Sequence, residues 1–316
     1  MERGPSRKPI LVTGSHRSGT TWVGRMLAAS GEAGYMHEPF NPNRAPGWLA
    51  RPLPRWFMYL DDHNAGPYEP AITRAVDMRY PLAAGLAPPR PKRIPHQLRE
   101  WKDSLVYRAR KLRPLLKDPI ALFSTEWLAR TYDMNVVVMI RHPAAFVGSI
   151  KRLNWGFDYE REWLAQEPLM RDLLGPFAND FRGYEGEVDL VGEGIVMWNA
   201  MYHAVDKLRA RHPEWSFTKL EDLASDPETG FRDLYRATGL SWDEKARAAM
   251  LATAAEGNPG EVSRRQRRSI RRDSRAATGT WAKRLTPEEI ERVRLETAKV
   301  ARLFYDDSTW ETRTRT

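Results

Sequence analysis

A glycine-containing turn between an apolar strand and a helix, close to the N-terminus, constrains the fold of this chain more than any other feature. Residues 9–14 form an apolar run typical of a buried strand, and residues 20–29 have the apolar spacing of an amphipathic helix. Between them, residues 14–21 carry the sequence GSHRSGTT, with two glycines at the spacing of a phosphate-binding loop. In such a loop, backbone N–H groups and a helix N-terminus surround an anion.

Further strand and helix patterns alternate along the chain. Residues 135–140 are an unbroken apolar run, which suits a central parallel strand covered on both faces, and a helix pattern follows with Pro143 at its first position. Shorter strands are expected at residues 115–117 and 216–220, each before a helix. The pattern predicts an α/β fold, a central parallel sheet flanked by helices with the phosphate-binding loop after the first strand.

The chain is expected to form a single domain over residues 1–316. Residues 42–114 are rich in proline and arginine, and we expect them to form an inserted cap and acceptor region of helices and loops. Residues 260–285 are expected to form a C-terminal lid loop. After it, the sequence TPEE at residues 286–289 is a helix-capping signature, so a packed helix should end the domain.

Composition excludes several classes of protein. The chain has no cysteine, so disulfides, thiolate metal sites and cysteine nucleophiles are excluded, and its seven histidines include no pair at metal-binding spacing. We therefore expect no metal. No apolar run is long enough to span a membrane, so we expect a cytoplasmic protein without a membrane partner. The net charge of +9 indicates an anionic partner, without deciding which one.

The loop departs from the ATPase type of phosphate-binding loop. That type needs a lysine directly after the second glycine, but Thr20 follows Gly19 here. A cation stands two residues before that glycine instead, as Arg17, where it can reach a bridging oxygen. This disfavours a conventional nucleoside triphosphatase.

Two motifs resemble those of the sulfotransferases that use 3′-phosphoadenosine 5′-phosphosulfate (PAPS). The sequence RSGTTW at residues 17–22 is similar to the family's 5′-phosphosulfate loop. Arg141 ends the apolar strand and Ser149 follows eight residues later, as in the family's 3′-phosphate motif. The resemblance implies a sulfotransferase fold, PAPS as the donor co-substrate, and a donor site made of His16, Arg17, Ser18, Gly19, Thr20, Thr21, Trp22, Arg141 and Ser149.

A third motif lies in the expected lid. Residues 274–281, of sequence SRAATGTW, are similar to the family's C-terminal loop, in which Arg-Lys-Gly precedes Gly-x-Trp. Arg275, Gly279 and Trp281 match this loop, and the resemblance implies donor contacts from Ser274 and Arg275 although Ser274 itself departs from the family residue. The arginine-rich run at residues 264–272 is either part of a basic lid or a solvated charged loop.

Sulfuryl transfer needs cations at the transferred group and a base for the acceptor hydroxyl. Arg17 is expected to neutralise the leaving oxygen, and Lys117 matches a family lysine that contacts the sulfuryl group. The aryl sulfotransferases place a histidine base two residues after that lysine, where this chain has Pro119. The carbohydrate sulfotransferases use a glutamate after the first helix, which corresponds to Glu38 here; His37 and His16 are the alternatives.

We therefore predict transfer of a sulfuryl group from PAPS to a hydroxyl of a small-molecule or carbohydrate acceptor, without a metal. The alternatives are a nucleotide kinase-like phosphotransferase, which the missing lysine disfavours, and a non-catalytic nucleotide-binding or nucleic-acid-binding protein. We expect no nucleic-acid partner, because the charged donor accounts for the basic character with fewer assumptions. The aromatic residues between 155 and 163 either line an acceptor pocket or belong to the core; they are Trp155, Phe157, Tyr159 and Trp163.

Overall fold

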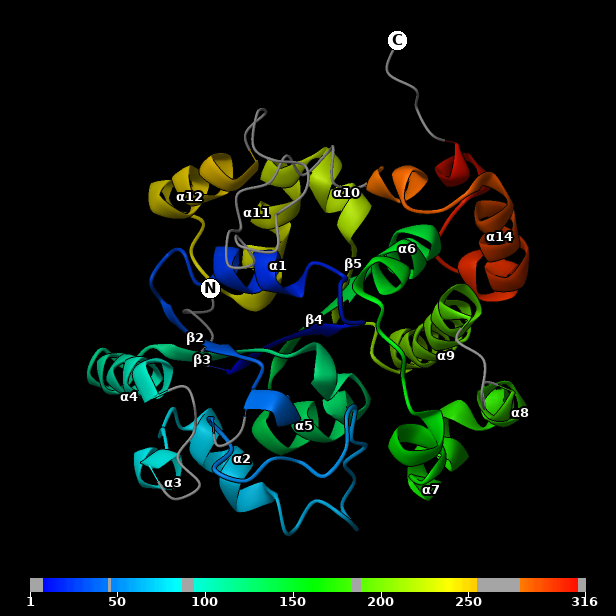
Figure 1. The fold of residues 1–316 in the computed structure, drawn as a ribbon. Helices are drawn as coiled ribbons and strands as arrows, with labels where there is room; N and C mark the ends of the chain where they lie inside the picture. Colours follow the sequence, from blue (N-terminus) through cyan, green and yellow to red (C-terminus); the bar gives the residue numbers. More distant parts are fainter. Residues whose placement is uncertain (1–7, 45–46, 87–93, 184–188, 255–278, 312–316) are drawn as a thin grey trace. The chain divides into compact units, whose positions relative to one another are not determined.

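A parallel five-stranded sheet forms the centre of the protein, which confirms the predicted α/β fold (Figure 1). The structure is a computed structural model, and it describes residues 8–44, 47–86, 94–183, 189–254 and 279–311. In the sheet the strand order is β2-β3-β1-β4-β5. The strands are β1 (Ile10–Gly14), β2 (Ala33–His37), β3 (Arg113–Lys117), β4 (Asn135–Ile140) and β5 (Ser216–Lys219).

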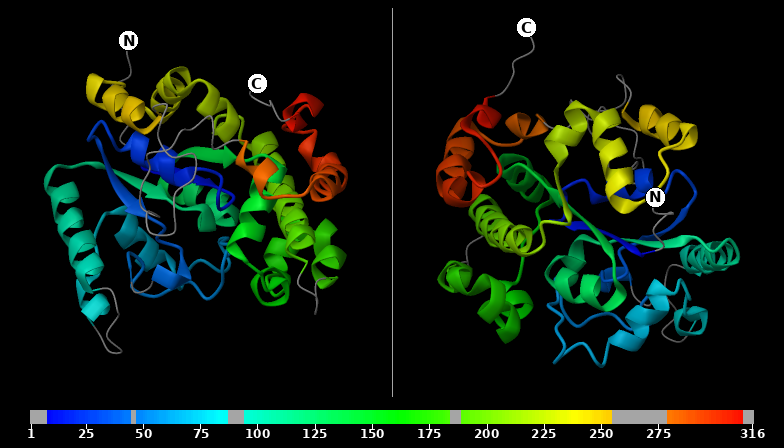
Figure 2. Two further views of the ribbon diagram at one scale, coloured as in Figure 1. Left: turned by 45° about the horizontal axis from the view of Figure 1, so that its top comes forward. Right: turned by 180° about the vertical axis from the view of Figure 1, so that it is seen from behind.

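The two apolar strands predicted from sequence are buried. All five residues of β1 and the last five of β4 are buried, as an unbroken apolar run in a parallel sheet requires. Helix α1 (Thr20–Leu27) lies on one face of β1, β2 and β3, and α5 (Thr125–Tyr132) lies on the other (Figures 1 and 2).

The chain divides into two compact units. The first comprises residues 1–16, 20–138 and 231–249, and the second comprises residues 17–19, 139–230 and 250–316. Besides α1 and α5, the first unit holds α2 (Glu69–Val76), α3 (Leu82–Leu86), α4 (Ile94–Ala109), a 3₁₀ turn η1 (Pro42–Arg44) and a 3₁₀ helix η2 (Pro119–Ser124).

The second unit is mainly helical. Helix α9 (Leu190–Arg211) packs against α6 (Pro143–Leu153) and α14 (Pro287–Ala301) (Figure 1). The unit also holds α7 (Glu167–Leu169), α8 (Ala178–Arg182), α10 (Leu220–Ser225) and the start of α11 (Pro227–Thr238), while α12 (Glu244–Ala254) runs from the first unit into the second. The predicted cap of α14 is confirmed, because the Thr286 hydroxyl and the Glu289 carboxylate bond each other's backbone N–H groups.

The region of residues 42–114 contains more regular structure than its sequence pattern indicates. Helix α4 has 16 residues, but its buried positions include the polar residues Gln97 and Ser104, while Leu98 and Leu105 are exposed. An amphipathic pattern is therefore absent, which explains why this helix was not predicted. In the described residues, no helix is both long and apolar enough to cross a lipid bilayer.

Candidate active site

The carboxyl ends of β1, β2 and β3 meet at one edge of the sheet and bring two of the candidate catalytic residues, Lys117 and Glu38, together. Lys117, the last residue of β3, pairs in register with Val12 of β1 on one side and with His37 of β2 on the other. The N–H of Glu38 donates to the Lys117 carbonyl at 2.8 Å, so Glu38 begins the turn directly after β2. Ligands of open parallel sheets bind at this kind of edge.

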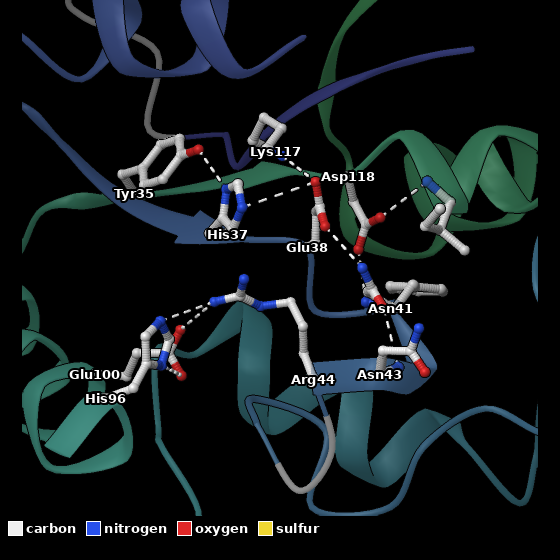
Figure 3. A network of polar contacts seen from close by, with 12 residues as sticks. Tyr35, His37, Glu38, Asn41, Asn43, Arg44, His96, Glu100, Lys117 and Asp118 are labelled. Atoms are coloured by element: carbon white, nitrogen blue, oxygen red, sulfur yellow. Dashed lines mark hydrogen bonds and ion pairs between the residues drawn. The ribbon is translucent and has the colours of Figure 1, made fainter. Parts of the chain in front are cut away.

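Lys117 and Glu38 form a buried ion pair (Figure 3). The Lys117 Nζ lies 2.5 Å from Glu38 Oε1, and Asn41 Nδ2 donates to Glu38 Oε2 at 2.8 Å. The Lys117 side chain is fully buried, while 19% of the Glu38 side chain is exposed. Burial raises the pKa of Glu38, but the charge of Lys117 and these hydrogen bonds outweigh burial and bring the pKa down to about 2. Glu38 is thus ionised at neutral pH.

His37 connects this ion pair to Tyr35 (Figure 3). The Tyr35 hydroxyl lies 2.8 Å from His37 Nδ1, and His37 Nε2 lies 3.8 Å from Glu38 Oε1. Burial and the nearby Lys117 cation lower the pKa of His37 to about 3, while burial raises the pKa of Tyr35. His37 is therefore a neutral imidazole that is hydrogen-bonded to Tyr35 and lies beside Glu38.

Asp118 holds the turn that carries Glu38. Its side chain is fully buried and accepts the Phe40 N–H at 2.5 Å and the Ile120 N–H at 2.9 Å. Burial, followed by the negative charge of Glu38, raises the pKa of Asp118 to about 7. One carboxyl group thus joins the chain after β2 to the start of η2, so Asp118 fixes the position of Glu38 relative to Lys117.

Gly24 of α1 lets the helix approach this site closely. A Cβ at this position would lie 2.9 Å from Lys117 Cγ and 3.0 Å from Tyr35 Cε2. Contacts this short between carbon atoms are repulsive, so only glycine fits without moving two residues of the site.

Gly24→Ala should therefore lower turnover by about tenfold or more, because displacement of Lys117 misplaces the group that contacts Glu38. The measurement is the steady-state rate of the sulfuryl transfer that the sequence resemblance implies, beside thermal melting. Gly66→Ala is the matched control, because a Cβ at Gly66 would meet nothing within 4 Å. Equal activity of Gly24→Ala and the wild type would contradict this role for Gly24.

The predicted phosphate-binding loop contains three residues with positive φ, namely Gly14, Arg17 and Gly19, and its Arg17 side chain reaches Ser149. Arg17, with φ 67°, is exposed, and its Nε donates to the Ser149 hydroxyl at 3.0 Å. Gly19 has φ 90°, and a Cβ there would lie 2.7 Å from Leu220 Cδ1. A glycine is thus needed at position 19 both for its backbone and for space. The structure brings Arg17 and Ser149 together although 132 residues separate them.

Arg141 directly follows β4 and is fixed through its main chain. Its N–H donates to the Tyr202 hydroxyl at 2.7 Å, and its carbonyl accepts from Trp198 Nε1 at 2.9 Å. Its Nε lies 3.6 Å from the carboxylate of Glu221, which also accepts from the Tyr305 hydroxyl at 2.9 Å. Two aromatic residues of α9 and one carboxylate therefore set where the Arg141 side chain begins and where it points.

The described end of the expected lid lies against the residue after Arg141. Trp281 is buried and stacks on His142, with ring centroids 5.7 Å apart and planes 16° apart. Ser274, Arg275 and the arginine run at residues 264–272 lie outside the described residues.

The other residues of the predicted loop take ordinary structural positions. His16 is buried against Phe57, with ring centroids 5.7 Å apart. The buried Ser18 precedes α1, whose first residues are Thr20, Thr21 and Trp22; the Trp22 ring meets the ring of Phe231 edge to face at 5.0 Å.

The aromatic residues after the second motif belong largely to the core. Tyr159 and Trp163 are buried and pack with Phe157 and Phe181, whereas Trp155 is exposed. Of the two interpretations of this cluster, the structure favours core packing.

Sequence reasoning missed three residues of the site. Tyr35 lies on the same face of β2 as His37, but this alternation could not be used because the strand itself was not predicted. Asp118 follows Lys117 directly, but nothing in the sequence shows that its carboxyl group bonds Phe40. Nothing in the sequence distinguishes Gly24 from other residues of the helix. Its role follows from the structure, where Lys117 lies so close that a side chain at position 24 would not fit. Among the residues that the structure describes, no group of three or more His, Asp or Glu side chains could hold a metal ion.

Comparisons with solved structures find sulfotransferases. The sulfotransferase domain from the curacin biosynthetic pathway has a TM-score of 0.50 and 16% identity, covering 95% of this chain and 99% of that one. The sulfotransferase domain of the Synechococcus PCC 7002 olefin synthase has a TM-score of 0.47 and 18% identity, covering 96% and 97%. A sulfotransferase from Alicyclobacillus acidocaldarius has a TM-score of 0.44 and 15% identity, covering 96% and 99%.

The curacin-pathway domain supports the fold alone. A comparison with curated proteins gives no significant match. The family model described as the sulfotransferase family matches residues 9–244, which is most of the sequence and includes β1 to β5, the glycine loop and both Lys117 and Arg141. This chain therefore belongs to the sulfotransferase family.

Proposed function

We propose that this sulfotransferase transfers a sulfuryl group from PAPS to a hydroxyl of a small-molecule or carbohydrate acceptor. The observation that carries the proposal is the buried contact of 2.5 Å between Lys117 and Glu38 at the carboxyl edge of the sheet. It pairs a cation for the transferred group with a carboxylate that can receive a proton. PAPS is consumed in each turnover, so it is a substrate of the reaction and not a resident cofactor.

The residues expected to bind the donor fit a nucleotide with two anionic ends. Arg17 of the 5′-phosphosulfate loop supplies a guanidinium, and its Nε lies 3.0 Å from the hydroxyl of Ser149, which belongs with Arg141 to the 3′-phosphate motif. Gly19, with φ 90°, gives the loop a backbone turn in which successive N–H groups can face a phosphate. Arg141, whose main chain is fixed by Tyr202 and Trp198, offers a second guanidinium for the 3′-phosphate.

In the proposed reaction, the acceptor oxygen forms a bond to sulfur as the bond from sulfur to the bridging phosphate oxygen breaks. The acceptor proton passes to Glu38, and 3′-phosphoadenosine 5′-phosphate (PAP) leaves with its negative charge neutralised by Arg17. Lys117 stabilises the charge that builds on the sulfuryl oxygens.

The ion pair with Lys117 keeps the proton affinity of Glu38 low while no donor is bound. With a pKa of about 2, Glu38 is a weak base while Lys117 holds it. Sulfuryl oxygens compete with Glu38 for the Lys117 ammonium group, because both are anionic. That competition removes the main influence that lowers the pKa of Glu38, and its proton affinity rises when the acceptor hydroxyl must be deprotonated.

Binding of PAP, the desulfated product, tests the donor assignment. We expect PAP to bind at least about thirtyfold more tightly than AMP, because only PAP offers a 3′-phosphate and a charge-assisted contact contributes about 2 kcal/mol. Isothermal titration calorimetry measures both affinities. Equal affinities, or tighter binding of ATP than of PAP, would favour a kinase-like nucleotide site and end the assignment.

A further inference from the structure

A second cation, Arg44, lies beside the proposed catalytic residues and belongs to none of the family motifs. It ends the turn η1, six residues after Glu38. Its Nη2 lies 3.0 Å from His96 Nε2 and 3.4 Å from Glu100 Oε1. His96 and Glu100 are one turn apart on α4, and the side chains of Arg44 and Glu100 are 18% and 13% exposed. The guanidinium is thus held in place along one edge.

The guanidinium of Arg44 has another terminal nitrogen, and this one points toward His37 and Glu38 (Figure 3). The hydrogen bonds of the Arg44 side chain to His96 and Glu100 both use Nη2, and within the described residues no acceptor bonds its other terminal nitrogen. The charge of Arg44 also reaches the site, since it adds to burial and Lys117 in lowering the pKa of His37. Arg44 therefore directs both charge and N–H donors toward the place where an acceptor must lie to reach Glu38.

We propose that Arg44 is a specificity residue that binds an anionic group, of the carboxylate class, on the hydroxyl-bearing acceptor. The inference rests on the proposed function, because it takes Glu38 as the group that receives the acceptor proton. A guanidinium offers parallel N–H donors that match the two oxygens of a carboxylate. Because His96 and Glu100 already hold Arg44, little side-chain freedom is lost when the acceptor binds.

The Glu38 site itself does not supply this recognition. The charge of Lys117 is matched by Glu38, and Asn41 donates to the same carboxylate. An acceptor held by its hydroxyl alone would meet the ionised carboxylate of Glu38, whose charge Lys117 already matches. In the described part of the chain, Arg44 is ion-paired with Glu100 through Nη2 only, so its other terminal nitrogen can bind an acceptor carboxylate. Acceptors with a carboxylate should therefore be preferred over neutral analogues of the same shape.

Matched acceptor pairs test this inference. We expect the wild type to show a kcat/KM for 4-hydroxybenzoate or 3-hydroxyhexanoate at least about tenfold above that for the corresponding amide, because a hydrogen bond to a charged group is lost in the amide. Arg44→Gln should remove the preference by raising KM for the carboxylate while leaving the amide nearly unchanged. Arg99→Gln, on the same helix as His96 and Glu100 and with a side chain that is 77% exposed, is the control and should keep the preference.

Calorimetry with benzoate and hexanoate in the presence of PAP separates this inference from the proposed function, since it needs no turnover. Binding to the wild type that Arg44→Gln weakens at least about tenfold supports the anion site even if no acceptor is sulfated. Equal kcat/KM within both pairs, or an equal loss for carboxylate and amide in Arg44→Gln, would overturn it. Should that variant fail to fold, Arg44→Lys keeps the charge without the paired donors, and an undiminished preference there would overturn the inference as well.

Discussion

Replacing Glu38 with glutamine is expected to lower kcat by about 10² to 10⁴ while the affinity for PAP changes by less than about twofold. Glutamine has nearly the same shape, and its amide oxygen can still accept from Asn41 or from Lys117. It cannot take up the acceptor proton at neutral pH. The loss should therefore fall on the transfer step, which single-turnover and steady-state assays with PAPS measure beside calorimetry with PAP.

Two further variants make this result specific. Glu291→Gln changes an exposed glutamate of α14 and should leave kcat unchanged. His37→Asn removes the competing base, and we expect a smaller loss than for Glu38→Gln, because His37 acts through its contact with Glu38. Full turnover by Glu38→Gln together with its loss in His37→Asn would move the base to the imidazole.

A strand could be predicted from the sequence where it is a continuous run of apolar residues. β4 spans residues 135–140 as predicted, since every residue of the run NVVVMI except the first is buried. β2 was not predicted because its sequence AGYMH is short and begins with two small residues. Its stability comes from pairing with β3 and from Tyr107, which packs where a Cβ of Gly34 would lie.

The residues of the candidate site that could be predicted are those that belong to the motifs shared with the family. The order of the motifs led to Arg17 and Ser149, and the structure places them within 3.0 Å. Lys117 and Glu38 were expected from two separate resemblances, and the sheet register makes them one ion pair. Asp118 takes its role from its hydrogen bond with Phe40, and Arg44 takes its role from its contact with His96 of α4. Both contacts join segments far apart in sequence, so no local sequence pattern predicts them.

The second large effect is expected at Arg141. Arg141→Gln should weaken PAP binding by about thirtyfold or more and leave AMP binding within about twofold, because only the 3′-phosphate loses its charged partner. The variant should fold, since the main chain of residue 141 is held by the Tyr202 hydroxyl and the Trp198 indole whatever its side chain. Calorimetry with both nucleotides gives the ratio directly.

Weaker PAP binding by Arg141→Gln could come from the lost contact with the 3′-phosphate or from a disturbed site, and the residues around Arg141 distinguish the two. Glu221 loses the Arg141 Nε at 3.6 Å but keeps the N–H of His142 and the hydroxyl of Tyr305, so its carboxylate stays satisfied in the variant. Arg236→Gln, which removes an exposed guanidinium paired with Asp233, controls for the loss of one positive charge. If Arg141→Gln weakened PAP and AMP equally, or if Arg236→Gln removed the preference for PAP, Arg141 would not be the group that recognises the 3′-phosphate.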